Sequence, residues 1–240
     1  MTEVETAAAT GTASGLFVTF EGGDGTGKTT QLRRLAARLR AAGRAVVETR
    51  EPGGAPGAEE IRRLVLEGEP GRWSAVTELL LFNAARRDHL ERVIAPALAQ
   101  GKVVLCDRFA DSTRVYQGAS RDAADAADAA APEGDAAAPP APSRALVDAL
   151  HALVIGREPD LTLVLDADPV RALARGIDRG GPELRFERMG LPFHQAVRAR
   201  FRALVEASPE RCRLIDASGA PDEVERRVRE AMAQRLPEVL

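Results

Sequence analysis

The sequence predicts an α/β fold of the doubly wound type, in which helices cover both faces of a parallel sheet. Three observations predict it: short apolar runs recur along the chain, longer stretches of helical period separate them, and the two kinds of segment alternate throughout. The runs are continuous rather than alternating with polar residues, which is typical of parallel strands buried on both faces.

The expected strands, in chain order, are residues 16–20, 45–49, 102–106, 161–165 and 212–215. After the first strand, apolar residues recur at helical spacing, and Gly43 is placed to end this helix as a C-cap. Residues 74–99 predict a long helix bent at Pro96. The remaining expected helices are 58–67, 144–155, 169–175, 193–207 and 221–236.

The domain organisation follows from length and composition. With 240 residues, of which 45% are hydrophobic and 29% charged, the chain fits a single globular domain over residues 15–240. Residues 1–14 and the Ala/Asp/Pro-rich residues 119–143 carry almost no large apolar side chains. Neither segment can bury enough surface to offset its ordering entropy, so we expect a disordered tail and a solvated insertion.

Charge and composition exclude several function classes. The formal net charge of −3 argues against binding to a nucleic-acid backbone, which needs a basic excess. Two cysteines and three histidines without metal-ligand spacing argue against a zinc site or a disulfide framework. No apolar stretch is long enough to cross a membrane, and the N-terminus lacks signal-peptide features. We therefore expect a soluble cytoplasmic protein that binds neither nucleic acid nor membranes.

The strongest motif directly follows the first expected strand. Residues 22–29, GGDGTGKT, fit the P-loop pattern G-x-x-x-x-G-K-[ST] and lead into a helix. Glycines let successive backbone N–H groups converge on phosphate oxygens, and the helix N-terminus adds its positive end. Lys28 then reaches the β- and γ-phosphates of a nucleotide, and the Thr29 hydroxyl binds Mg²⁺. The residues expected to bind the nucleotide are Gly22, Gly23, Asp24, Gly25, Thr26, Gly27, Lys28, Thr29 and Thr30.

A P-loop alone does not distinguish kinases from GTPases and motor ATPases. GTPases need an Asn-Lys-x-Asp element, but the only asparagine, Asn83, precedes two alanines. Motor ATPases usually end a strand in Asp-Glu, whereas the third expected strand ends in Asp107-Arg108. In this pair, Asp107 is the acid expected beside the metal ion and Arg108 is a cation next to it. Such a cation can bind a second phosphate, as a kinase that phosphorylates a phosphate group requires. The alternative is a structural ion pair at the strand end.

Several blocks in order resemble bacterial thymidylate kinases, and they cover nearly the whole chain outside the tail and the insertion. The blocks are FEGGDGTGKTT (20–30), TREPGG (49–54), LLLFNAAR (79–86), VLCDRFADSTRVYQG (104–118), PDLTLVLD (159–166) and RFE (185–187). The resemblance implies transfer of the γ-phosphoryl group of ATP to dTMP, with Mg²⁺ as cofactor. It also implies a homodimer and a three-layer P-loop NTPase fold with a five-stranded sheet of order 2-3-1-4-5.

The resemblance also implies roles for individual residues. Asp24 would face the 3′-hydroxyl of the acceptor, Phe82 would stack on thymine, and Arg86 would donate to its O4. Thr113 would contact the base edge, and Tyr116 would press against the sugar at C2′. The substrate-binding set is Arg50, Glu51, Phe82, Arg86, Asp107, Arg108, Thr113, Tyr116 and Gln117, and the metal set is Thr29, Glu51 and Asp107.

Without the resemblance, three of these residues could instead have a purely structural role. Phe82 could be helix core, since Leu79, Leu80 and Leu81 precede it. Tyr116 could be core as well, although it is the only tyrosine and lies in a polar stretch. Arg86 and Arg87 could form a solvated helix face.

The chain departs from the family pattern in the residues that would stabilise the migrating phosphoryl group. Some members carry an arginine inside the P-loop, where this chain has Gly25. The compensating arginines should then lie in a lid at about residues 174–188, where the usual Asp-Arg-x-Glu is replaced by Leu184-Arg185-Phe186-Glu187. The expected catalytic set is Lys28, Asp24, Arg108, Arg175 and Arg185, with Arg179 binding the nucleotide.

Two other functions compete with phosphoryl transfer to dTMP: another deoxynucleotide or deoxynucleoside kinase of the same fold, and a non-catalytic paralogue. A deoxynucleoside kinase would need a carboxylate base for the 5′-hydroxyl, whereas an acceptor phosphate is already ionised and needs positioning and positive charge instead. A non-catalytic nucleotide-binding paralogue is disfavoured by the intact Asp24, Lys28, Thr29 and Arg108.

Overall fold

Five parallel strands form one sheet in the order β2-β3-β1-β4-β5, which confirms the predicted topology. The computed structural model describes residues 15–67, 72–117, 142–177 and 189–236. The expected tail, almost all of the expected insertion, and the lid residues Arg179 and Arg185 lie outside these ranges. The strands are β1 (Leu16–Glu21), β2 (Val46–Arg50), β3 (Val103–Asp107), β4 (Leu161–Asp166) and β5 (Cys212–Asp216).

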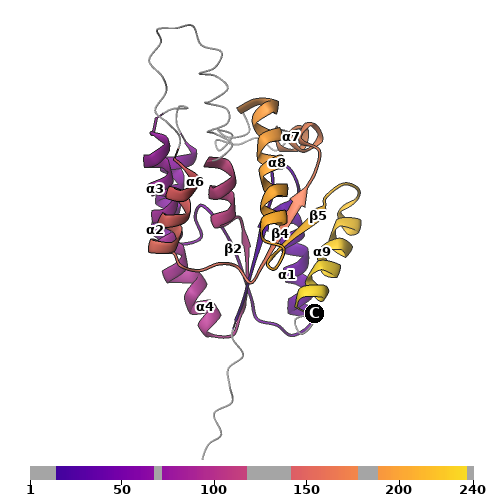
Figure 1. Cartoon of the computed structure of the whole chain (residues 1–240). Coiled ribbons are helices and arrows are strands. Elements are labelled where there is room, and N and C mark those ends of the chain that lie inside the picture. The colour runs from indigo at the N-terminus through magenta and orange to yellow at the C-terminus, as the bar shows by residue number, and fades with distance from the viewer. Residues whose placement is uncertain (1–14, 68–71, 118–141, 178–188, 237–240) are drawn as a thin grey trace, which may run out of the picture.

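Helices cover both faces of the sheet (Figure 1). They are α1 (Lys28–Ala41), α2 (Pro56–Leu66), α3 (Ala75–His89), η1 (Leu90–Ile94), α4 (Ala95–Ala99), α6 (Arg144–Val154), α7 (Pro169–Ile177), α8 (Gly190–Ala207) and α9 (Pro221–Arg235). Every expected strand and helix is present, with ends shifted by a few residues. None of the helices in the described ranges is long and apolar enough to cross a membrane.

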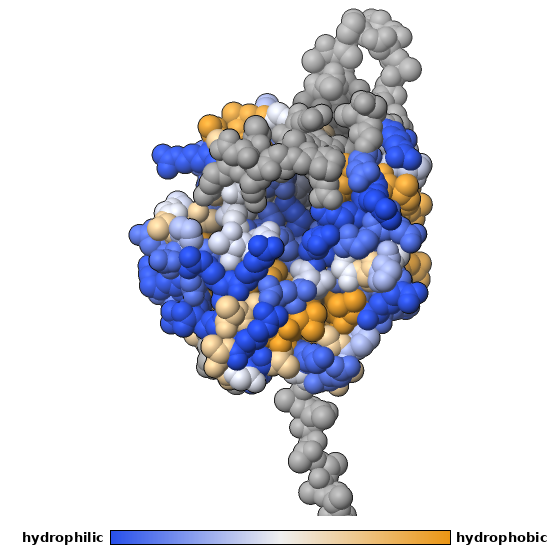
Figure 2. All heavy atoms as spheres, turned by 180° about the vertical axis from the view of Figure 1, so that it is seen from behind, coloured by the Kyte–Doolittle hydropathy of each residue, from blue (hydrophilic) through white to orange (hydrophobic). Residues whose placement is uncertain are grey.

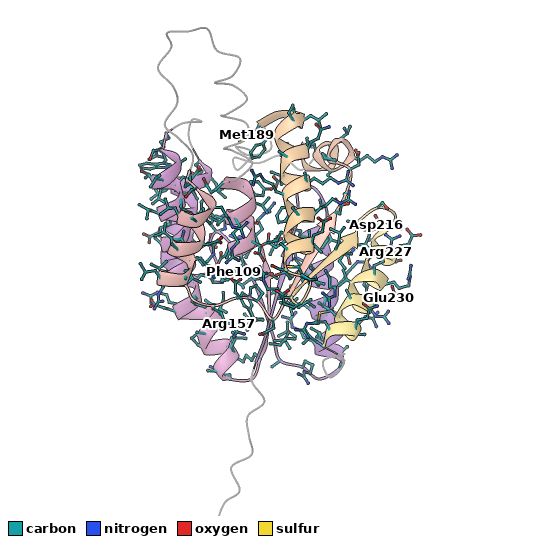
Figure 3. The ribbon with its side chains drawn as sticks, in the orientation of Figure 1. Phe109, Arg157, Met189, Asp216, Arg227 and Glu230 are labelled. Carbon is teal, nitrogen blue, oxygen red and sulfur yellow. The ribbon has the colours of Figure 1, made fainter. Side chains whose placement is uncertain are left out.

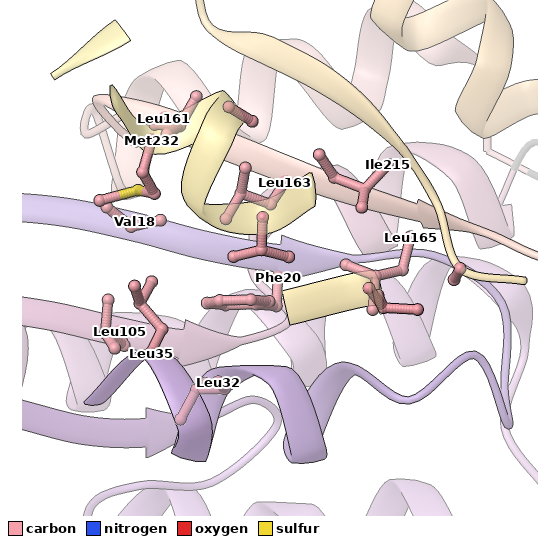
Figure 4. Packing of buried hydrophobic residues seen from close by; sticks show 14 of the residues in the cluster. Val18, Phe20, Leu32, Leu35, Leu105, Leu161, Leu163, Leu165, Ile215 and Met232 are labelled. Atoms are coloured by element: carbon pink, nitrogen blue, oxygen red, sulfur yellow. The ribbon is translucent and has the colours of Figure 1, made fainter. Parts of the chain in front are cut away.

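The pleat of each strand divides the core between the two faces. Val18 and Phe20 of β1 pack with Leu35 of α1 and with α9, as Figure 4 shows. Phe17 points to the opposite face, where it meets Phe109 edge to face with ring centroids 4.9 Å apart. Figure 3 shows Phe109 in the interior and Arg227 and Glu230 at the outside of α9. Burying both faces explains why the strands are continuous apolar runs.

The surface seen from behind is mostly hydrophilic, with smaller hydrophobic areas between the charged side chains (Figure 2). This agrees with the high share of charged residues in the sequence, 29%. Most of the large hydrophobic side chains are buried against the two faces of the sheet.

The long helix expected over residues 74–99 is interrupted rather than simply bent. A π-helical turn, η1, separates α3 from α4 and lies directly before Pro96. Proline lacks an N–H, and its ring clashes with the carbonyl four residues earlier, so the α-helical ladder cannot run through this position. The wider π turn accommodates that break.

A further helical segment, residues 110–117, was not predicted. It carries buried polar side chains at Asp111, Thr113, Arg114 and Gln117. The helical period of this segment is therefore polar, and a search for apolar periodicity passes over it. The segment begins just after β3 and brings Thr113 and Tyr116 to the carboxyl end of the sheet.

Candidate active site

The P-loop runs from β1 into α1 at the carboxyl end of the sheet, where ligands bind in open α/β folds. Gly22, Gly25 and Gly27 have φ values of 127°, 74° and 96°, a region that favours glycine. The Lys28 ammonium donates to the carbonyls of Gly22 and Gly23 at 3.2 and 2.8 Å. Burial lowers the pKa of Lys28 to about 8, and the nearby Arg108 charge adds to this effect. Lys28 thus lies across the loop in which it would meet phosphates.

Gly25 explains one departure from the family pattern. A Cβ added at this residue would lie 1.8 Å from the carbonyl oxygen of Ala172 in α7. The P-loop therefore packs directly against α7, and an arginine at residue 25 would displace that helix. The positive charge that an arginine would supply has to come from another part of the chain.

Replacing Gly25 by alanine is expected to destabilise the protein much more than replacing Gly27. Both residues have positive φ, which costs an alanine about 1 kcal/mol, but a Cβ at Gly27 meets nothing within 4 Å. Gly25→Ala adds a backbone clash with α7, so its total cost should be about 3 kcal/mol. Urea unfolding of the two variants measures the difference, and equal losses would contradict the packing described for Gly25.

The residues expected on the metal side, Thr29 in the first turn of α1 and Asp107 at the end of β3, lie together. The Thr29 hydroxyl donates to an Asp107 carboxylate oxygen at 2.5 Å. In the described ranges, no three His, Cys, Asp or Glu side chains gather into a metal site. This donor set fits Mg²⁺, which is usually held by one or two protein oxygens together with phosphates and water.

Arg108 is the centre of a second cluster, beside the P-loop. Its guanidinium donates to Asp24 at 2.5 Å, to the Gly22 carbonyl at 3.0 Å and to the Tyr116 hydroxyl at 3.2 Å. The Tyr116 hydroxyl in turn donates to Asp24 at 3.0 Å. Burial alone would raise the pKa of Asp24, but the charges of Arg108 and Lys28 hold it below its ordinary value. Asp24 is thus a carboxylate held beside two cations.

A third cluster joins β2, α3 and the 110–117 segment. Arg86 donates from Nε to Glu51 at 2.6 Å and from Nη2 to the Thr113 hydroxyl at 3.0 Å. Arg86 is buried whereas its neighbour Arg87 is exposed, so only Arg87 belongs to a solvated helix face. Glu51 also contacts His89 at 3.0 Å. Both Glu51 oxygens are thus engaged within this cluster.

Three other expected residues have distinct surroundings. Phe82 is partly buried and lies one turn before Arg86 on α3, outside the core clusters of the described chain. Gln117 is buried, and its side-chain oxygen has no hydrogen-bond partner in the described part of the chain. Arg50 is half-exposed and pairs with Glu59 at 3.0 Å. The side chain of Arg175, in the last turn of α7, is outside the described residues.

A pocket lies between the P-loop, the end of β4, α7 and α8. Asp24 and Gly23 line one side of it, and His194 and Arg198 of α8 line the other. His194 is buried, and its Nε2 has no hydrogen-bond partner in the described ranges. Sequence reasoning missed His194, since a lone histidine on a helix carries no spacing signal.

Glu21 was also missed, although it ends β1 inside a recognised block. It is fully buried and accepts from the Phe109 N–H at 2.7 Å and from the Ser112 hydroxyl at 2.6 Å. Burial, together with the nearby Asp111 charge, raises the pKa of Glu21 from 4.5 to about 7. Glu21 therefore ties the start of the 110–117 segment to β1, beside the P-loop.

Replacing Glu21 by glutamine should stabilise the protein at pH 8 but change little at pH 5. The pKa of Glu21 is higher folded, about 7, than its ordinary 4.5, so the folded state holds more protons between these pH values. The free energy of unfolding of the parent consequently falls as the pH rises through this window. Glutamine keeps an acceptor for the Phe109 N–H without the charge, so the gain at pH 8 should be about 2 kcal/mol. Urea unfolding at both pH values tests this, and a Gln variant less stable at pH 8 would refute it.

Comparisons with known proteins agree with this geometry. The family model described as thymidylate kinase matches residues 20–131 and 140–228. A thymidylate kinase of Jannaschia sp. is 54% identical over 93% of this chain and 98% of its own length. One of Dinoroseobacter shibae is 57% identical over 89% of this chain and 94% of its own length. The crystal structure of thymidylate kinase from Ehrlichia chaffeensis superposes with a TM-score of 0.67 at 32% identity, covering 91% of this chain and 98% of that chain.

Proposed function

The chain belongs to the thymidylate kinase family and is an ATP:dTMP phosphotransferase. We propose that three groups of residues divide this reaction between them: the P-loop with Thr29 and Asp107, the cluster around Arg108, and the cluster around Arg86. The observation that carries the proposal is the adjacency of the P-loop to Arg108, Asp24 and Tyr116. With this adjacency, one site would hold both a cradle for the donor phosphates and a second phosphate-binding cation. The products are dTDP and ADP, and we propose that the enzyme acts in the cytoplasm.

On the donor side, the P-loop N–H groups and Lys28 would bind the phosphates of ATP. Lys28 would exchange its contacts with the carbonyls of Gly22 and Gly23 for phosphate oxygens. Thr29 and Asp107 would hold Mg²⁺. Glu51 is also expected on the metal side from the sequence, but Arg86 and His89 engage both of its oxygens, so we assign it to Arg86 and not to the metal. A bound Mg²⁺ would neutralise charge on the transferring phosphoryl group.

On the acceptor side, Arg108 would bind the dTMP phosphate, with the half-exposed Arg50 as a second cation. Phe82 would stack on thymine, and Arg86 and Thr113 would meet its edge, with Gln117 nearby. In the described chain, Arg86 Nε and Nη2 are engaged by protein oxygens and Nη1 has no such partner. Nη1 is therefore the nitrogen that we assign to O4 of the base.

The reaction needs no general base, because the acceptor phosphate is ionised at neutral pH. The described carboxylates near the acceptor are already committed: Glu51 to Arg86 and His89, and Asp24 to Arg108 and Tyr116. This arrangement disfavours a kinase that acts on a nucleoside hydroxyl. We also propose that the lid closes over ATP and that Arg175, with at least one of Arg179 and Arg185, supplies the charge that Gly25 does not.

The function is tested by initial rates with ATP across dTMP, dUMP, dCMP, dGMP, UMP and thymidine. We expect dTMP to give the highest kcat/KM, by about tenfold or more over the other nucleotides. Faster phosphorylation of thymidine than of dTMP would instead indicate a deoxynucleoside kinase. No turnover with any acceptor, in a protein that binds ATP, would indicate a non-catalytic paralogue.

The assembly that we propose is a homodimer formed through α2, α3 and α6, which lie side by side in Figure 1. Apolar side chains on these helices face outward: Leu64, Val76, Leu80 and Leu153. Leu80 is 51% exposed and Leu153 82% exposed, which is costly for a monomer in water. Sedimentation velocity tests the proposal, and a monomer at micromolar concentration would contradict it.

Replacing Tyr116 tests how the site selects a deoxyribose. The Tyr116 ring is held between Arg108 and the rings of Phe193 and Phe201, whose centroids lie 6.0 and 6.4 Å away. Because the ring supplies the bulk, Tyr116→Phe should keep most of the preference for dTMP over its ribo analogue. Tyr116→Ala should lower this ratio of kcat/KM values about tenfold. An alanine variant that discriminates as well as the parent would disprove the role of Tyr116 at the sugar.

A further inference from the structure

A buried chain of hydrogen bonds continues behind the Glu51–Arg86 pair and ends at Thr49. The Nδ1 atom of His89 lies 3.0 Å from Glu51 Oε1, and its Nε2 lies 2.6 Å from the Thr49 hydroxyl. His89 has no exposed surface, and Glu51 and Arg86 are almost fully buried as well. The hydrogen bonds thus link Thr49 in β2 to His89 in α3, then to Glu51, and finally to Arg86.

The donor in the hydrogen bond between His89 and Glu51 can be assigned from chemistry alone. An ionised Glu51 carboxylate only accepts hydrogen bonds, so His89 must donate from Nδ1. The other ring nitrogen, Nε2, is hydrogen-bonded to the Thr49 hydroxyl, which can serve as donor or acceptor. Glu51 and Arg86 form a buried ion pair, and His89 engages the Glu51 oxygen that Arg86 leaves free.

The backbone at Gly54 packs closely against the His89 ring and holds it in place. A Cβ at Gly54 would lie 2.5 Å from both His89 Nε2 and Thr49 Oγ1. Gly54 also has a positive φ of 87°. Thr49, Glu51 and Gly54 all belong to the block TREPGG, so this block encloses one edge of the His89 ring.

We propose that His89 is a positioning residue for recognition of the acceptor base. With Thr49, it fixes the Glu51 carboxylate, and Glu51 fixes the Arg86 guanidinium so that Nη1 points to an acceptor atom on the base. Nothing in the arrangement brings His89 itself to the substrate. The inference rests on the proposed contact between Arg86 and the base, and the experiment tests that contact separately.

The decisive variants are His89→Leu, which removes the Nδ1 donor, and His89→Asn, whose amide can replace it. For His89→Leu we expect the KM for dTMP to rise about tenfold while the KM for ATP stays within about twofold. Cytosine carries an amino donor where thymine carries O4, so the preference for dTMP over dCMP should fall about fivefold. His89→Asn should restore most of both quantities.

A double-mutant cycle separates positioning from a merely structural role. Since His89 acts through Arg86, His89→Leu should add nothing to the KM for dTMP in an Arg86→Ala background. His151→Leu, which alters another buried histidine, is the matched control and should lower thermal stability without changing the dTMP/dCMP ratio. If Arg86→Ala alone leaves the KM for dTMP unchanged, the assignment of Arg86 fails and the inference with it.

Thr49→Val and Thr49→Ser keep the inference testable if His89→Leu does not fold. Valine removes the hydroxyl that is hydrogen-bonded to Nε2 and should raise the KM for dTMP about threefold, whereas serine should not. A folded His89→Leu or Thr49→Val protein with the parental KM and the parental dTMP/dCMP ratio would overturn the proposal.

Discussion

Replacing Lys28 by alanine is expected to lower kcat about a hundredfold or more, equivalent to roughly 3 kcal/mol of transition-state stabilisation. Lys28 lies across the P-loop with its ammonium 2.8 Å from the Gly23 carbonyl, where it would meet the transferring phosphate. Gly25 leaves the loop without an arginine, so in the described ranges Lys28 is the one cationic side chain of the P-loop itself. Its loss should therefore reduce kcat more than the affinity for dTMP.

The chain supplies a matched control for this variant. Lys102 is the only other lysine, and it precedes β3 at the amino end of the sheet, opposite the site. Lys102→Ala should keep the parental kcat and KM in the same coupled ATP/dTMP assay. Near-normal turnover in a folded Lys28→Ala protein would show that the P-loop is not the donor site.

The sequence was a good guide to the sheet because buried parallel strands leave an unambiguous pattern. Every apolar run became a strand, and the spacing of Gly22, Lys28 and Thr29 located the phosphate loop. Helix 110–117 was not predicted because its buried positions hold Asp111, Thr113, Arg114 and Gln117. Asp111, Thr113 and Arg114 bind partners far away in the chain, such as Arg211 on Asp111 at 2.5 Å. Local periodicity contains no information about such partners.

The same limit applies to individual site residues. Arg86 and Arg87 are adjacent in one helix, and only the tertiary contact with Glu51, 35 residues earlier, distinguishes the buried from the exposed one. The resemblance to a family selected Arg86 where composition could not. His89 and Glu21 carried no signal, because their roles depend on which elements the sheet order β2-β3-β1 places side by side. Topology had to be known before these contacts could be inferred.

Replacing Arg108 is expected to affect both activity and stability, and two variants separate the effects. Arg108→Ala and Arg108→Gly both remove the guanidinium that would bind the acceptor phosphate, so each should lower kcat/KM about a hundredfold or more. Both variants also remove the guanidinium that lies 2.5 Å from Asp24. The stability lost with that ion pair is the same in both, so it cancels when their free energies of unfolding are compared. The remaining difference lies in the backbone of residue 108.

Arg108 has a φ of 71°, the only positive value among the non-glycine residues of the described chain. This conformation costs an L-residue with a side chain roughly 1–2 kcal/mol, and glycine adopts it without strain. Arg108→Gly should therefore be more stable than Arg108→Ala by about 1 kcal/mol while being equally inactive. Urea unfolding with equal m-values measures this difference, and Arg87→Ala, at an exposed arginine, should leave kinetics unchanged. An alanine variant as stable as the glycine variant would mean that no strain is stored at this residue, and a glycine variant with parental turnover would remove Arg108 from the acceptor site.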